Sequence, residues 1–89
     1  MNRKAAREVA LARLAEWESV SPETLLEILP DGESILETII ESNGRKWLVR
    51  TTAFWEDEGA RQLRVTVSVD DGGLLSGIFP VSASSRMQM

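Results

Sequence analysis

Four acidic residues near predicted turns are the first candidates for chemistry. Asp70 and Asp71 follow a predicted strand, and Asp57 and Glu58 lie in the turn before it. Carboxylate oxygens are the ligands that calcium prefers, but the spacing is not that of an EF-hand loop. Acidic residues are also frequent in turns between strands. We therefore expect these residues to form turns, and we predict no metal site and no cofactor.

Catalytic chemistry has few groups to draw on, because the 89 residues include no histidine, cysteine or tyrosine. The commonest general base, the thiol nucleophile and most ligands for transition metals are therefore missing. The acids are scattered over a predicted helix and several turns, without the facing pair that carboxylate hydrolysis needs. We predict that the protein is not an enzyme, that it has no catalytic residues and that it takes no small-molecule substrate.

A basic stripe on the outer face of a predicted sheet is the next candidate, formed by Arg45, Lys46, Arg50, Arg61 and Arg64. Such a stripe could bind phosphates. We expect Glu37, Glu41 and Glu56 to be its cross-strand neighbours and to neutralise it. The net charge of −4 and the pI near 4.8 also argue against a general nucleic-acid surface. We expect no nucleic-acid partner, and a role in DNA uptake is kept as an alternative.

Three tryptophans could stack on a ligand. Trp17 and Trp47 are expected in the core, whereas Trp55 lies beside a turn and is expected to be an exposed contact residue. A domain with a tryptophan-lined ligand pocket is one of the alternatives left open.

A helix is predicted over residues 3–18, because Ala, Leu, Arg, Lys and Glu dominate there. This helix carries Trp17, the first of the three tryptophans. At helical periodicity its apolar residues form one stripe, into which Arg13 intrudes. The stripe consists of Ala6, Val9, Ala10, Leu14 and Trp17.

The charges of this helix oppose its dipole. Arg3, Lys4 and Arg7 occupy the first two turns, and two glutamates occupy the last, whereas a helix favours acids at its start and bases at its end. One explanation is that Met1 is not the natural start and that the helix continues upstream. The other is that surface charges tolerate a poor arrangement.

After Ser21, residues 22–29 are predicted to form a short helix or a packed loop. Residues 34–42 fit either a helix or a strand, and we favour a strand because Asn43 and Gly44 follow as a hairpin signal.

Alternating apolar and polar residues predict further strands over 45–56 and 61–70. A fourth strand is predicted over 74–82, at a sheet edge because it contains Pro80, and residues 83–89 are expected to be a frayed tail.

These elements predict a single α+β domain over residues 1–89. One N-terminal helix would pack on an antiparallel meander of three or four strands within 34–82, because a sheet with one apolar face needs a cover. No stretch of the sequence is apolar for the 18 or more residues of a membrane span.

The sequence resembles the soluble part of type IV pilin-like proteins. The resemblance rests on Leu-Ala-Glu-Trp-Glu-Ser at 14–19, Gly-Arg-Lys-Trp at 44–47 and Leu-Arg-Val-Thr-Val-Ser-Val-Asp-Asp-Gly-Gly at 63–73, and it spans roughly residues 5–80. It is most similar to minor pilins and to the minor pseudopilin I of type II secretion. In that family a leader and an apolar helical half precede such a domain, and the second half of the helix packs on an antiparallel sheet.

The leader cleavage site, the glutamate near the mature N-terminus and the apolar span of the family are missing here. The resemblance therefore implies a truncated soluble portion of a protein that is anchored in the bacterial inner membrane, with this domain facing the periplasm or built into a pilus. Other pilin-like or pseudopilin subunits and the inner-membrane assembly platform are the implied partners.

The outer side of the helix is the implied subunit interface. It is formed by Arg3, Lys4, Arg7, Leu11 and Ala15, and its alternative is ordinary solvated helix surface. The expected function is that of a minor pilin or pseudopilin at the tip of a pilus or pseudopilus. The alternative is a stand-alone cytosolic protein-binding or regulatory module of the α+β class.

Overall fold

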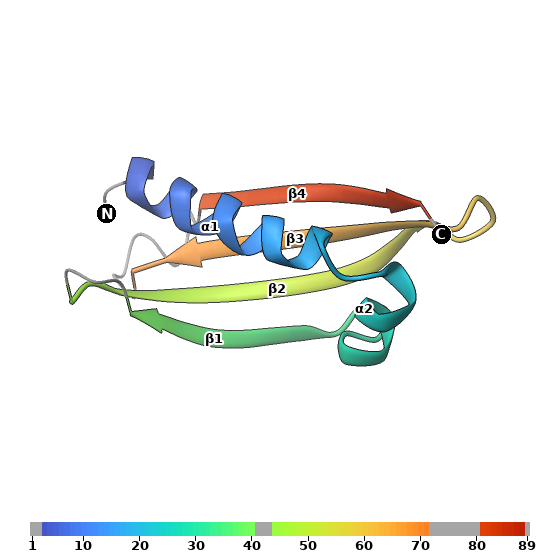
Figure 1. Ribbon diagram of the computed structural model, residues 1–89, viewed down its shortest axis with the longest axis horizontal. Coiled ribbons are helices and arrows are strands. Elements are labelled where there is room, and N and C mark those ends of the chain that lie inside the picture. Colours follow the sequence, from blue (N-terminus) through green and yellow to red (C-terminus); the bar gives the residue numbers. More distant parts are fainter. Residues whose placement is uncertain (1–2, 41–43, 72–80, 89) are drawn as a thin grey trace.

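The chain folds as an α+β structure in which helices cover one face of a four-stranded antiparallel sheet (Figure 1). The computed structural model describes residues 3–40, 44–71 and 81–88. The strands follow one another in the order β1-β2-β3-β4, which is a simple meander, and the predicted fold class is confirmed. The elements are α1 (Arg3–Glu18), α2 (Pro22–Ile28), β1 (Ser34–Ile40), β2 (Lys46–Asp57), β3 (Gln62–Asp70) and β4 (Val81–Gln88).

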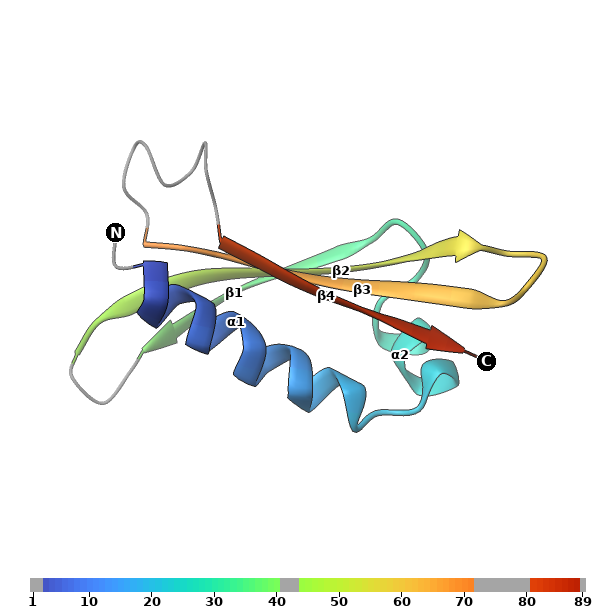
Figure 2. The ribbon, with the colours of Figure 1, turned by 90° about the horizontal axis from the view of Figure 1, so that it is seen from above.

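Helix α1 has the predicted bounds, and every member of its predicted apolar stripe is buried. The helix runs along the length of the sheet and lies mainly over β3 and β4 (Figures 1 and 2). This placement leaves the inner side of β1 less covered than that of β3. The burial patterns show the difference, since β1 alternates between exposed and half-buried residues, whereas β3 alternates between half-buried and buried ones.

The sheet side of the core is formed by β2 and β3, in which buried and more exposed residues alternate along most of each strand. Val49 pairs with Val69 and Ala53 with Val65, and all four are fully buried beneath the helices. Because successive side chains of a strand point to opposite faces, the remaining residues of β2 and β3 form the other face of the sheet. The prediction of strands over 45–56 and 61–70 is confirmed to within about one residue at each end.

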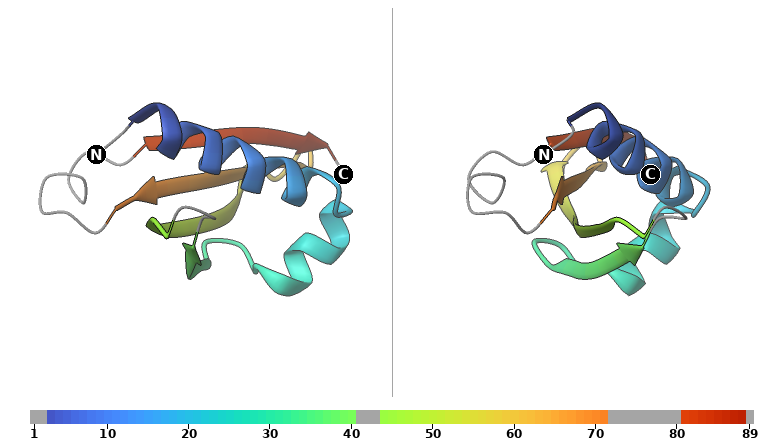
Figure 3. Two further views of the ribbon diagram at one scale, coloured as in Figure 1. Left: turned by 60° about the vertical axis from the view of Figure 1, so that its left-hand side comes forward. Right: turned by 90° about the vertical axis from the view of Figure 1, so that its left-hand side faces the viewer.

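The segment that fitted a short helix or a loop is helix α2. Ser21 caps it, since its Oγ accepts a hydrogen bond from the backbone N–H of Thr24 at 3.3 Å, and Pro22 is the first helical residue. Leu25 and Leu29 are buried in the same core as α1. Both helices therefore lie on one side of the sheet (Figure 3).

The ambiguous segment after α2 is the strand β1, as favoured, and it pairs with β2 through Ile35–Thr51 and Ile39–Trp47. Gly44 has a positive φ of 81°, which suits the hairpin signal. Asn43, the other residue of that signal, lies outside the described residues.

The last strand lies further along the chain than predicted. Residues 83–88 belong to β4, so the prediction of a frayed tail there is wrong, and residues 74–80 of the predicted strand lie outside the described part. The serine-rich sequence has little strand propensity of its own. It is a strand because it pairs with β3 from Val81 to Gln88 and places Met87 in the core.

Candidate functional site

A groove lies between α1 and β1, where the helix leaves the inner side of β1 partly uncovered. Its volume is about 290 Å³. The wall combines apolar and charged side chains, namely Val9, Ala12, Arg13, Glu16, Glu37 and Ile39.

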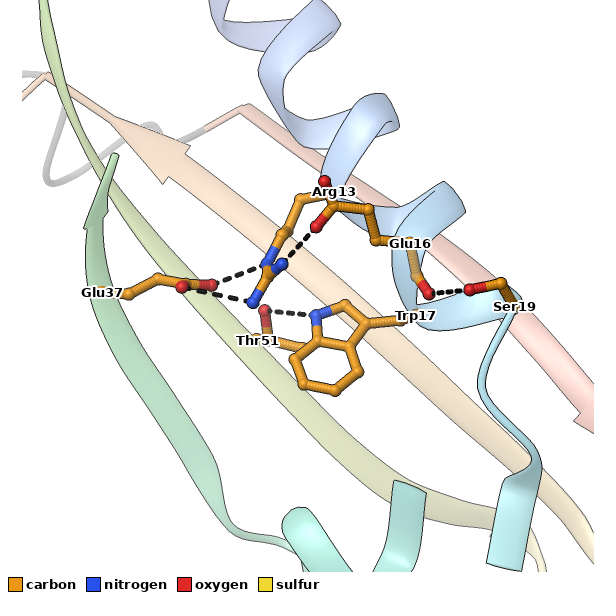
Figure 4. A network of polar contacts seen from close by, with 6 residues as sticks. All are labelled: Arg13, Glu16, Trp17, Ser19, Glu37 and Thr51. Carbon is orange, nitrogen blue, oxygen red and sulfur yellow. Dashed lines mark hydrogen bonds and ion pairs between the residues drawn. The ribbon is translucent and has the colours of Figure 1, made fainter. Parts of the chain in front are cut away.

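Arg13, which intruded on the apolar stripe of α1, is the centre of this groove. Its Nε and Nη2 donate to the two carboxylate oxygens of Glu37 at 2.7 and 3.2 Å, and its Nη1 donates to Glu16 (Figure 4). Two parallel hydrogen bonds to one carboxylate are the strongest arrangement available to an arginine. The pair joins the helix to the edge strand across the open side of the core.

Trp17 extends the same network into the core (Figure 4). The Arg13 guanidinium lies 4.9 Å from the centre of the indole ring, and the indole Nε1 donates to Oγ1 of the fully buried Thr51 at 3.2 Å. Burial opposes the charge of Arg13, but hydrogen bonds to Glu16 and Glu37 outweigh it and raise the pKa of Arg13 above its ordinary value. The arginine therefore stays charged, and the arrangement suits binding and orientation better than proton transfer.

The five residues of the predicted basic stripe do not lie together. Lys46, Arg50 and Arg64 belong to the face of the sheet away from the helices, whereas Arg45 lies near Trp47 on the opposite side and Arg61 is in a turn. The spread follows from the strand period of two, which sends neighbouring residues to opposite faces.

The expected neutralisation of the stripe is correct for Glu56 and wrong for Glu37. The Glu56 oxygens bind Arg64 at 2.7 Å and Arg86 at 2.6 Å, and the hydrogen bond from Arg64 is the main cause of a lowered Glu56 pKa. Glu37 instead faces the helix, because it occupies an inward position of β1. Glu41 lies outside the described residues.

The predicted subunit-interface residues of α1 are all exposed. Lys4, Arg7, Leu11 and Ala15 follow one another at spacings of three and four residues, so they form one line along the exposed side of the helix. Arg3 is also exposed and begins the helix. Leu11 is the large apolar member of this line and is 45% exposed.

Trp55 is not the exposed contact residue that its position beside a turn suggested. It is half-buried and packs against the core. The correction follows from alternation, because Trp55 is on the same face of β2 as Trp47 and Ala53.

The acidic turn residues are not brought together. Asp57 and Asp70 stand at opposite ends of the paired strands β2 and β3, and the carboxylate of Asp57 accepts a hydrogen bond from the backbone N–H of Ala60 at 3.0 Å. Among the described residues there is no group of three or more acids that could hold a metal ion. The absence of a metal site stays a prediction.

The uncovered face of the sheet was missed by the sequence analysis. Leu36 and Ile40 of β1 are 58% and 63% exposed there, and Leu48 and Phe54 of β2 are each 36% exposed. The signal was present in the same alternation that identified the core, since these residues hold the even positions of their strands.

Neither helix of the described part is both long and apolar enough to cross a membrane. Comparison of the chain with protein-family models, with curated proteins and with solved structures finds no match.

Proposed function

We propose that this chain is a structural subunit that acts by assembly with other protein subunits, in the manner of a minor pilin or of a minor pseudopilin of type II secretion. The other subunits would be pilin-like proteins, held together with the inner-membrane assembly platform. The function requires no reaction and no cofactor.

One observation carries the proposal: a single long helix lies lengthwise on an antiparallel sheet and keeps one continuous side exposed. That side presents Lys4, Arg7, Leu11 and Ala15 in one line, with basic charge at one end and small or apolar residues further along. A helix side of this kind can pack against a different face of the next subunit, and such a contact generates a helical filament.

Under this proposal an apolar helical segment precedes Arg3 in the natural protein and holds it in the inner membrane. The basic residues of the first turns would then lie in mid-helix, where the helix dipole no longer disfavours them. The reading frame upstream of residue 1 tests this point, because the proposal requires it to encode an apolar stretch and a basic leader.

The assembly itself is tested by co-purification with the pilin-like proteins encoded in the same genome. We expect at least one of them to bind, and we expect Leu11→Glu to weaken that binding by about tenfold or more because it places a charge in the centre of a packed contact. Ile28→Glu is the matched control, since Ile28 is similarly exposed on the other helix. Failure of every such protein to bind at high concentration contradicts the proposal.

A stand-alone binding module is the second candidate function, and the apolar residues of the uncovered sheet face favour it. A chain that naturally begins at Met1 and binds a partner through this face, with Leu11→Glu having no effect, would support the module against the filament subunit.

A further inference from the structure

The face of the sheet opposite the helices carries exposed apolar residues together with charged ones, and the apolar residues are Leu36, Ile40, Leu48 and Phe54. Leu48 pairs with Thr38 on β1, and its diagonal neighbour Leu36 pairs with Arg50. Isolated exposed leucines are ordinary, but a contiguous apolar area with a polar surround is typical of an interaction surface. We call this surface the open face.

The strand register divides the open face into rows that cross the sheet. Arg50 and Thr52 stand at the middle of β2, and their rows are completed mainly by serines and threonines of the other strands. Moving outward along β2, Leu48 and then Lys46 lie on one side of this middle, and Phe54 and then Glu56 lie on the other. On β3, Asp70 is beside Leu48, and Arg64 is beside Phe54.

We propose that the open face binds the open face of a second copy of this chain, about a two-fold axis that crosses the strands between Arg50 and Thr52. Such an axis places each strand opposite the same strand of the second copy. Each residue then faces the residue that lies at an equal distance on the other side of the middle. Leu48 then faces Phe54, Asp70 faces Arg64 and Lys46 faces Glu56. In these three pairs an apolar side chain meets an apolar one and each charge meets its opposite, as an isologous interface favours. In the two middle rows, Leu36 faces Ser34 and Arg50 faces Thr52 of the second copy.

A two-fold axis along the strands does not give this match. It would set β2 over β3 of the second copy within the same row, so that Leu48 would face Asp70 and Phe54 would face Arg64. Both contacts would bury a charge against an apolar side chain, which is costly. Charge complementarity therefore selects the axis that crosses the strands.

The size of the face predicts a weak dimer. Four strands spaced by about 4.8 Å, with an average of nine residues each at about 3.4 Å per residue, give roughly 590 Å² for each copy, or about 1,200 Å² in total. This total is near the lower limit of about 1,200 Å² for stable interfaces, and the twist between aligned sheets reduces it further. The described open face also carries four cations, Lys46, Arg50, Arg64 and Arg86, against the two carboxylates of Glu56 and Asp70, so two copies repel each other at long range.

Sedimentation equilibrium over micromolar to millimolar concentrations, combined with charge reversal, tests the proposal. The wild type should form dimers that dissociate on dilution. Lys46→Glu alone and Glu56→Lys alone should each weaken the dimer by about tenfold or more, because each places like charges opposite one another. An equimolar mixture of the two variants should dimerise again, since both facing pairs regain opposite charges in the mixed dimer.

Leu48→Glu provides a variant that does not touch the ion pairs of Glu56 with Arg64 and Arg86, and it should give a monomer. Leu11→Glu on α1 is the control and should leave the dimer intact, whatever its effect on binding to pilin-like proteins. Circular dichroism confirms that each variant is folded. A wild type that is monomeric throughout, a dimer that persists in Leu48→Glu, or variants that do not rescue each other on mixing would each overturn the proposal.

Discussion

Trp17 and Thr51 form a buried polar contact between helix and sheet. The indole N–H and the threonine hydroxyl satisfy each other at 3.2 Å, at a place where neither has ready access to water. A buried donor that loses its only partner costs more than the net value of the hydrogen bond, because its desolvation is no longer compensated.

We therefore expect Thr51→Val to lower the free energy of unfolding by about 1–3 kcal/mol, although valine fits the same space. Thr38→Val, on the exposed side of β1, is the control and should change stability little. Urea denaturation followed by tryptophan fluorescence measures both. Equal stability of the two variants would show that the hydrogen bond contributes nothing.

Glu56 makes the stability of the protein depend on pH in the acid range. Its pKa in the folded state is lowered, first by the hydrogen bond from Arg64 and also by Arg86, so the unfolded state binds the proton more readily. The stabilisation is complete above the ordinary carboxyl pKa and is lost as pH falls through the lowered pKa of the folded state. We expect Glu56→Gln to reduce the loss of stability between neutral pH and about pH 3, measured as the shift in urea midpoint.

Glu58→Gln, in the exposed turn after β2, is the matched control for this measurement. If the wild type and Glu56→Gln lose the same stability between neutral pH and about pH 3, the role given to Glu56 is contradicted. Added salt should weaken the effect, because the network is on the surface.

At the scale of elements, turns decide how the strands meet. The turn before β1 places Gly32 at a φ of 81°, where its N–H donates to the carbonyl of Ala53 at 2.9 Å. Asp31 supports the same turn, since its carboxylate accepts a hydrogen bond from the backbone N–H of Trp55 at 2.7 Å. The turn thus fixes the start of β1 against β2.

Gly32→Ala should destabilise the fold by about 1–2 kcal/mol, because an alanine in this left-handed conformation is strained even though its Cβ would meet no other atom within 4 Å. Gly59→Ala is the matched control, since the turn at Gly59 does not require a positive φ and the new Cβ would make an ordinary contact at 3.5 Å. Thermal unfolding of both variants measures the difference. Equal melting temperatures would show that the left-handed conformation of Gly32 does not matter for stability.

The whole molecule has two surfaces with separate roles in our proposals, the exposed side of α1 and the open face of the sheet. If the open face forms a dimer, association stabilises the folded state by mass action, so the melting temperature should rise with protein concentration. Leu48→Glu should abolish that rise, and Leu11→Glu should preserve it. Scanning calorimetry over a wide range of concentrations makes the comparison, and a melting temperature independent of concentration would argue against the dimer.

Local patterns in the sequence predict the order of the elements and most of their bounds. They leave open whether residues 22–29 form a short helix or a packed loop, and they favour a strand over a helix for residues 34–42 only through the hairpin signal that follows. The stripe of α1 and the alternation of β3 are local patterns that show which side of each element is buried, and the cap of α2 shows where that helix begins. The exposed side of α1 followed from the same periodicity. The error at Trp55 arose where nearness to a turn was given more weight than alternation.

Tertiary structure alone decided where the elements lie on one another. Helix α1 sits over β3 and β4, and for that reason Arg13 meets Glu37 beside a groove, although the two residues are 24 positions apart. The strand β4 and the rows of the open face depend likewise on register. Register and crossing position are fixed by the packing of distant segments, and no local pattern encodes them.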